Sequence, residues 1–297
     1  MLEWLKFNNL MISNLFVEPL VIFPFLSEIY PDLVKIKKSI FSSESVTLVS
    51  EPKLGQLLSL SFLEASFLDK GILYHRKVVE NLNDFISDEK NLCIFFSEEN
   101  NLHNSGISVK PQEIKINMGE QKTSRVGKLD IVGISGCLAL MIGGERVKKL
   151  LALILAGNWL NSNLDYTYDP VFTSLRDSLK ENGLISIVSI VDVQEPDLIE
   201  LPGIDSVELN LLRDDWKKID LVEQSKRLSE LVKPLLTTSM GVARLEELIW
   251  HRIITTKWDS DLASQCSRAQ RELNSSTNKL VSASRLIDEI IMNAKLN

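Results

Sequence analysis

The chain has 297 residues, of which 44% are hydrophobic and 25% charged, and its formal net charge is −7 with a pI of about 5.2. This length allows one large domain or two small ones, and the composition is ordinary for a globular protein. Proteins that bind free DNA or RNA usually carry a basic face, so the overall charge gives no support to unaided nucleic-acid binding, although a local patch could exist.

The three cysteines, Cys93, Cys137 and Cys266, lie far apart in apolar or helical settings. They form neither a disulfide framework nor a metal-ligand spacing, which indicates a reducing compartment and predicts a cytoplasmic protein. Residues 15–26 are apolar, but Glu18 and two prolines interrupt them and no basic leader precedes them. We therefore expect a buried segment there and no membrane association.

Residues 1–44 are predicted to form a mostly helical lead-in. The pattern after it alternates between the two element types, which predicts a parallel sheet with crossover helices. The expected elements are strands at 46–50, 72–77 and 92–96, a helix at 54–69 ended by Gly71, a short helix at 78–86, a weak strand at 114–116, and loops at 100–108 and 118–128.

Residues Leu129 to Leu160 hold two apolar segments separated by Gly143 and Gly144. Each segment is shorter than the roughly 18 to 20 apolar residues that span a bilayer, so a buried helical pair is favoured over a membrane hairpin. Small residues interleaved with Leu, Ile and Met suit helices that pack closely.

Asp169 and Pro170 predict a helix start, with Asp169 as the cap, and 184–191 reads as a central strand. From about residue 204 onward every segment is predicted to be helical, namely 207–216, 221–236, 242–254, 262–273 and 280–294. The expected fold class is thus α/β, a parallel sheet flanked by helices with a mainly helical C-terminal region. The expected division is 1–44, 45–193 and 194–297.

Few residues indicate chemistry. The chain has no phosphate-binding glycine loop and no nucleophile elbow, and His75, His103 and His251 lack the partners of a zinc site. Carboxylates near strand ends could hold Mg²⁺ or Mn²⁺, and the candidates are Glu98, Glu99, Asp165 and Asp169. A cap role for Asp169 and a solvated loop for Glu98 and Glu99 are the favoured alternatives.

One basic cluster, Arg146, Lys148 and Lys149, follows the glycine pair at the start of the second buried helix. A helix N-terminus with cationic side chains could hold a phosphate. The commoner role of such residues is to solvate the start of the helix.

The order of elements from Val46 to Leu160 resembles the DHH phosphoesterase superfamily, which contains RecJ-type nucleases and inactive relatives in replication complexes. The run VTLVSEPKLGQLLSLSFLEASFLDKGILYHRKVV is similar to the family's first strand, glycine turn, helix and second strand. LCIFFSEEN is similar to its acid-bearing later strand, DIVGISGCLALMIG to the run after the DHH motif, and VKKLLALILAGNWLN to a later family helix. The segment around Lys233 and Pro234 is similar to one seen in some members, and together these runs cover about half of the chain.

The departures from this family concern its metal ligands. Where the family has Asp-x-Asp-Gly, this chain has Pro52-Lys53-Leu54-Gly55, and the DHH triplet is absent. Ser97 stands where a metal-binding aspartate would end the later strand, and Asn161 occupies the last acid position. Hydrolysis by paired divalent ions needs several carboxylates and a histidine. The resemblance therefore implies a non-catalytic member with no catalytic, cofactor or metal residues.

Three functional hypotheses follow. The first is a non-catalytic, RecJ-like scaffold subunit of a DNA replication or repair complex, with protein partners and with nucleic acid bound only within the complex. The second is an α/β enzyme, a metal-dependent phosphoesterase or other hydrolase, that uses the acidic residues named above. The third is an assembly or regulatory protein that docks its partner through its C-terminal helices, with the apolar stripe of residues 280–291 as the contact.

Overall fold

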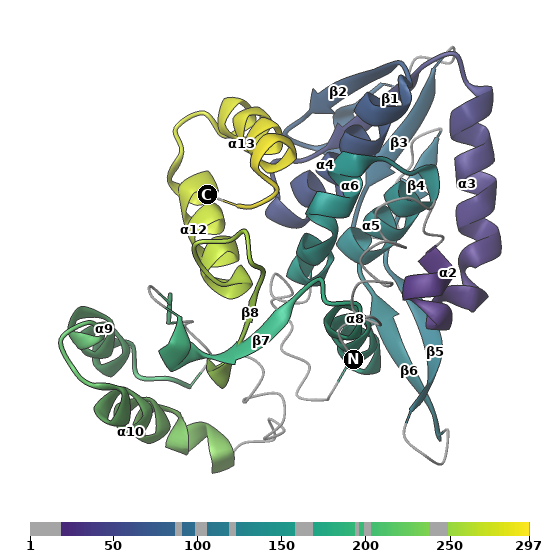
Figure 1. Ribbon diagram of the computed structural model, residues 1–297. Coiled ribbons are helices and arrows are strands. Elements are labelled where there is room, and N and C mark those ends of the chain that lie inside the picture. Colours follow the sequence, from purple (N-terminus) through teal and green to yellow (C-terminus); the bar gives the residue numbers. More distant parts are fainter. Residues whose placement is uncertain are drawn as a thin grey trace.

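The computed structural model describes residues 19–86, 91–98, 106–118, 123–157, 169–193, 196–198, 203–237 and 249–296. Within these ranges a four-stranded parallel sheet has the order β2-β1-β3-β4, and helices flank it (Figure 1). Its strands are β1 (Val46–Ser50), β2 (Tyr74–Val78), β3 (Leu92–Phe96) and β4 (Ile107–Val109). The predicted parallel sheet with flanking helices is confirmed.

Alternate residues of the central strands enter two different cores. Leu48 of β1 and its neighbour Ile94 of β3 belong to the large core of the molecule. Val49 and its partner Phe95 belong to a small cluster on the other face, which the connection after β2 covers through η2 (Leu82–Asp84). Because both faces are covered, the strands consist of nearly continuous apolar residues, as expected for a parallel sheet.

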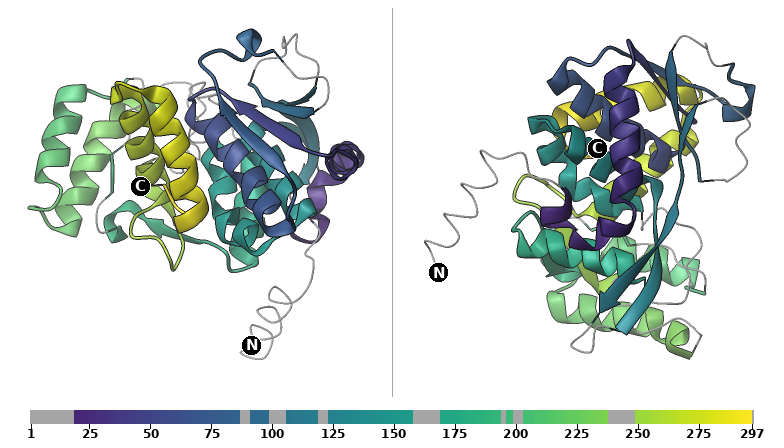
Figure 2. Two further views of the ribbon diagram at one scale, coloured as in Figure 1. Left: turned by 90° about the horizontal axis from the view of Figure 1, so that it is seen from above. Right: turned by 90° about the vertical axis from the view of Figure 1, so that its right-hand side faces the viewer.

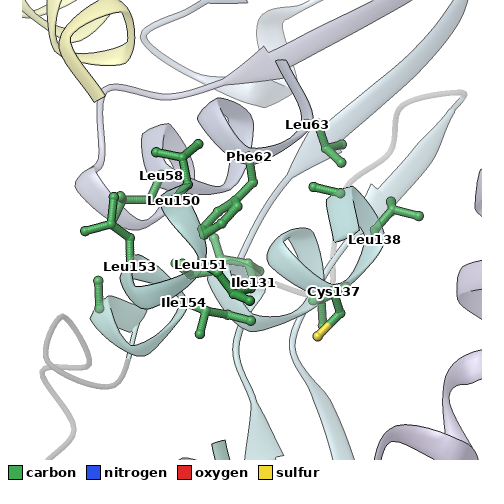
Figure 3. Close-up of a cluster of buried hydrophobic side chains, with 14 of the residues drawn as sticks. Leu58, Phe62, Leu63, Ile131, Cys137, Leu138, Leu150, Leu151, Leu153 and Ile154 are labelled. Atoms are coloured by element: carbon green, nitrogen blue, oxygen red, sulfur yellow. The ribbon is translucent and has the colours of Figure 1, made fainter. Parts of the chain in front are cut away.

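Helix α4 (Leu54–Lys70) lies at the centre of the large core, and every residue from Leu54 to Phe67 is buried. It packs on the predicted helical pair, which consists of α5 (Ile131–Ile142) and of α6 (Glu145–Leu150) continued by η3 (Leu151–Leu155). Figure 3 shows Phe62 of α4 between side chains of both segments. A Cβ atom on Gly136 would lie 2.9 Å from the Ile154 side chain. The small residues therefore permit close helix packing, as predicted.

The described part of the N-terminal lead-in is helical, as expected, with α2 (Pro19–Ile22), η1 (Pro24–Glu28) and α3 (Tyr30–Ser42). At the other end, α12 (Leu262–Ser275) and α13 (Lys279–Asn293) pack against α4 (Figures 1 and 2). None of the helices within the described ranges combines the length and apolar character needed to cross a bilayer.

The apolar stripe of α13 is core. Ala283, Leu286, Ile287 and Ile290 are buried in the large cluster. On the same side, Arg76 of β2 donates to the buried carboxylate of Glu64 in α4 and also bonds Asp288 and Ser284 of α13. This network joins α13 to the sheet, so the hypothesis that the stripe docks a partner is wrong.

Two predicted loops contain strands. Residues 118–128 were expected to be irregular, but β6 (Thr123–Leu129) pairs antiparallel with β5 (Gln112–Met118). Most residues of β6 are exposed and polar, so the run lacks the apolar alternation that marks a strand. Similarly, the predicted loop at 100–108 overlaps β4, which has only three residues. The predicted helix at 78–86 contains only the three residues of η2.

A strand is present within the predicted range 184–191, but its predicted central place in the sheet is wrong. This strand, β7 (Ser186–Ser189), pairs antiparallel with β8 (His251–Ile254), where a helix was expected, and neither strand joins the parallel sheet. Ile185 before β7 belongs to the large core, whereas Ile190 after it belongs to a second core. The run is apolar because β7 passes from one core to the other. We call the pair β7–β8 the ribbon between the two cores.

The second core belongs to a helical unit, residues 203–237, which lies beside the ribbon and apart from the sheet (Figure 1). Its helices are α9 (Ser206–Asp215) and α10 (Leu221–Val232), with η5 (Lys233–Thr237) after them. Leu209, Leu212, Trp216 and Leu228 fill the space between the helices. The other predicted helices of this region agree with the structure to within a few residues, and most of 242–254 lies outside the described residues.

Candidate functional site

The turn between β1 and α4 contains one carboxylate, Glu51, where the family that the sequence resembles has two in its Asp-x-Asp-Gly motif. The Glu51 carboxylate lies 2.6 Å from Lys53 Nζ and accepts the backbone N–H of Leu82 at 3.1 Å. Burial raises the pKa of Glu51, but the bonds from Lys53, Leu82 and Gln56 outweigh this effect, so its pKa is lowered. This carboxylate therefore stays charged and holds the connection after β2 in place.

Ser97 and Glu98 follow β3 at the carboxyl edge of the sheet, where ligands bind in open α/β folds. Ser97 is buried, and its backbone N–H donates to Val109 O at 3.1 Å, which extends the pairing of β3 with β4. The Glu98 side chain is exposed on one side but also lines a small hollow of about 70 Å³.

Three carboxylates converge on this hollow: Glu98, Asp130 and Asp169. Asp130 precedes α5, and its side chain accepts the backbone N–H of Gly133 at 2.8 Å. Asp169 precedes α8 (Pro170–Glu181) and accepts the N–H of Val171 at 2.8 Å, which confirms its predicted role as a helix cap. The hollow therefore lies between two helix N-termini, whose partial positive charge favours carboxylates.

The surroundings of Asp130 raise its pKa to about 6. Burial is the largest cause, and the negative charges of Asp169 and Glu98 act in the same direction, while hydrogen bonds from backbone N–H groups oppose them. A Cβ atom on Gly157 would lie 2.3 Å from the Asp130 carboxylate. A glycine at this position is therefore required for the chain to pass so close to the acid.

Asp130 is not among the acids that the sequence pattern singled out. Its signal was an aspartate directly before the apolar run of α5, which is the pattern of a helix cap. Of the acids that the analysis did name, the structure brings Glu98 and Asp169 to the same hollow. Glu99, Asp165 and Asn161 lie outside the described residues, so their roles remain predictions.

The residues present do not fit the paired divalent ions of the family that the sequence resembles. At the β1–α4 turn Pro52 and Leu54 stand where that family has acids, and the nearby carboxylate of Glu51 is engaged in structural contacts. Within the described ranges no three histidine, cysteine or acidic side chains form a group that could hold a metal ion. His75 and His251 are exposed on different sheets, and His103 is not among the described residues.

The basic cluster at the start of α6 is engaged by protein side chains. The carboxylate of Asp69 accepts the backbone N–H of Arg146 at 2.8 Å and also pairs with the guanidinium of the same residue. Lys148 Nζ lies 2.7 Å from Glu145. An acid of α4 thus occupies the position that a phosphate would take, which favours a structural role for Arg146 and Lys148.

No family model and no curated protein matches this sequence. Among solved structures, 12 chains match. One of them is CDC45 from Entamoeba histolytica, with a TM-score of 0.51 and 11% sequence identity, over 91% of this chain and 68% of that chain. The chain therefore has the fold of CDC45, a degenerate DHH/RecJ-like protein, and the resemblance found in its sequence is confirmed at the level of the fold.

Proposed function

We propose that this protein is a non-catalytic, RecJ-like scaffold subunit of a DNA replication or repair complex. The observation that carries the proposal is the β1–α4 turn within a CDC45-like fold. Lys53 pairs there with the only carboxylate of the turn, and Leu82 binds the same group. A site of this kind holds two segments of the protein together and leaves no open ligand set for metal-assisted hydrolysis.

The distribution of charge supports protein partners. With a net charge of −7, the chain as a whole repels nucleic acid. A local exception lies between α9 and α12, where a hollow of about 530 Å³ is lined by five cations and two acids. The cations are Arg213, Lys217, Lys218, Arg268 and Arg271. Asp197 lies 3.9 Å from Arg213 and 2.7 Å from Arg271, which reduces the positive charge of this hollow. We therefore propose that it contacts a phosphate backbone only within a complex that holds the nucleic acid in place.

We also propose a cytoplasmic location for the protein. All three cysteines are free, and Cys93, Cys137 and Cys266 are buried. Buried unpaired thiols suit a reducing compartment. Fractionation of the source cells, with the native protein detected by antibody, tests this location.

Two measurements test the scaffold function. The purified chain is incubated with single-stranded DNA and with a small phosphodiester in Mn²⁺, and we expect no turnover above buffer; robust turnover would refute the non-catalytic assignment. The tagged full chain is then crosslinked in its source cells, and we expect replication or repair proteins among the captured partners. Their absence, with other proteins captured instead, would refute the assignment to such a complex.

A second candidate function is a hydrolase that works without a metal, centred on the hollow at α5. Glu98, Asp130 and Asp169 line this hollow, which favours acid–base chemistry there, but they do not form a group that could hold a metal ion. Asparagine preserves a helix cap, so Asp130→Asn and Asp169→Asn remove charge without removing the caps. Turnover that both variants abolish would establish this function in place of the scaffold.

A further inference from the structure

A groove lies between α9 and α10 of the helical unit. It encloses about 620 Å³, within the range of natural binding clefts. Both helices contribute to its lining, together with the segments before α9 and after α10. We call it the α9–α10 groove, and its rim consists of Asp205, Glu208, Asp215, Arg227 and Glu230.

The floor of the α9–α10 groove is apolar and accessible. Leu211 is 52% exposed, Leu231 is half-buried, and Pro234 is exposed. The helical unit also holds five of the thirteen large apolar residues that are exposed among the described residues, although it is a small part of the chain. Of these five, Leu211 lines the groove, and together with Leu231 and Pro234 it gives the groove an accessible apolar floor.

Acidic residues predominate at the rim of this groove. Residues 203–237 contain seven acidic and six basic residues, so the unit is nearly neutral. Four acids but only one base line the groove. That base, Arg227, lies 3.0 Å from Asp215 and 3.1 Å from Glu223, so its charge is neutralised. Within the described ranges no cation pairs with Glu208 or Glu230, and the groove presents a net negative rim.

We propose that the α9–α10 groove binds a basic amphipathic helix of a protein partner. This inference rests on the proposed scaffold function and names the class of partner. The apolar floor accepts the apolar face of such a helix, with side chains spaced three and four residues apart. Lys and Arg at the edges of that face meet the acidic rim. Nucleic acid is excluded, because its phosphates would face the same carboxylates.

The probe for this proposal is a synthetic peptide of about 18 residues, which is five helical turns. It carries a Leu stripe flanked by Lys and Arg. A control peptide has the same composition but scrambled Leu positions, and a second keeps the stripe but replaces the basic residues with Glu. Fluorescence anisotropy with the full chain measures binding. We expect the first peptide to bind about ten-fold or more tighter than either control. Its affinity should fall as the salt concentration rises from about 50 to 300 mM.

Paired variants locate the binding to the groove. Leu211→Gln removes an exposed apolar contact from the floor of the groove. The double variant Glu208→Lys, Glu230→Lys reverses the charge of the groove rim. All three side chains are exposed, so we expect these variants to fold. Each change should lower the affinity for the basic peptide about ten-fold or more. The matched controls are Val222→Gln, an exposed apolar residue of α10 outside the groove, and Glu181→Lys, an exposed acid of α8. Neither control should change the affinity.

Three outcomes would overturn the proposal: equal binding of the scrambled peptide, equal binding by the groove variants, or a dimer of the chain in sedimentation that the groove variants dissolve. The dimer would show that a second copy of the chain occupies the groove.

The crosslinking experiment separates this inference from the scaffold function. If the Glu208→Lys, Glu230→Lys variant still captures the replication or repair proteins, the groove assignment fails and the scaffold function stands. If the unchanged chain captures none, the scaffold function fails.

Discussion

The sheet-bearing part of the molecule and the α9–α10 unit use the same kinds of residues in opposite ways. The large core contains α4, α5 and α13 and buries every residue of α5 and every residue of α4 from Leu54 to Phe67. The helical unit has a much smaller core and leaves Val207, Leu211 and Leu236 exposed. The first region is built to be stable, and the second is built to present a surface.

Two acids of the helical unit differ from the engaged acids of both regions; Asp205 and Asp220 of this unit cap helices, and Asp215 pairs with Arg227. In the sheet-bearing part, Glu51, Glu64 and Asp69 each hold neighbouring segments together through hydrogen bonds. In the helical unit, Glu208 and Glu230 line a groove without a described cation partner. Acids that are engaged within the fold indicate structure, whereas exposed acids beside exposed leucines indicate binding.

The largest expected effect comes from the large core. Phe62→Ala in α4 removes a fully buried ring between the two apolar segments, and it should lower the free energy of unfolding by about 3 to 5 kcal/mol. Leu228→Ala in α10 should instead open the helical unit locally. Urea denaturation measures the first effect, and hydrogen exchange should show lost protection in residues 203–237 alone for the second. Loss of protection in α4 on Leu228→Ala would mean that the two cores form one cooperative unit.

The next effect concerns the ribbon between the cores. Arg252 of β8 is 1% exposed and lies 3.7 Å from the buried carboxylate of Asp261, which caps α12. Arg252→Leu leaves that charge buried with fewer partners and should cost about 3 kcal/mol, at the low end for a broken buried pair because the contact is long. Thermal unfolding measures the loss. Arg252→Leu combined with Asp261→Asn should recover part of it; an equal loss in the double variant would show that packing of the arginine, not the charge, matters.

The sequence predicted the parts of the fold whose signals are local. Helices α4, α5, α12 and α13 follow their apolar spacing and turn residues, and Asp169 caps α8 as its pairing with Pro170 indicated. Strands β4, β6 and β8 were missed because they are short or exposed. Of these, β8 pairs with β7, which is distant in the sequence. The apolar run at 184–191 was misread because a segment between two cores is as apolar as a central strand.

The candidate surfaces were predictable only in part. Glu98 and Asp169 were named from the sequence, but Asp130 joins them only because α5 begins at the same hollow. The α9–α10 groove was not predictable, since helical spacing identifies α9 and α10 without showing which of their faces stays uncovered. Both surfaces depend on how separate elements pack, which one sequence does not specify.

The smallest effect distinguishes the engaged acids from the exposed ones through pH. The folded protein retains the proton of Asp130 up to about pH 6, because burial disfavours the charge, whereas the unfolded chain releases it near the ordinary pKa of 3.8. Unfolding therefore releases a proton between these values, so the stabilising contribution is complete below about pH 4 and is lost as the pH rises to about 6. Asp130→Asn keeps the cap and removes the titration. This substitution should reduce the change of the free energy of unfolding with pH. It should also raise the free energy of unfolding at pH 7 by on the order of 1 to 2 kcal/mol, after an allowance for partial solvent contact. Urea midpoints from pH 4 to 7 measure the difference, and Asp130→Ala, which also loses the cap, should gain less. An unchanged slope in Asp130→Asn would show that the acid is already ionised in the fold, with the helix N-terminus compensating for its burial.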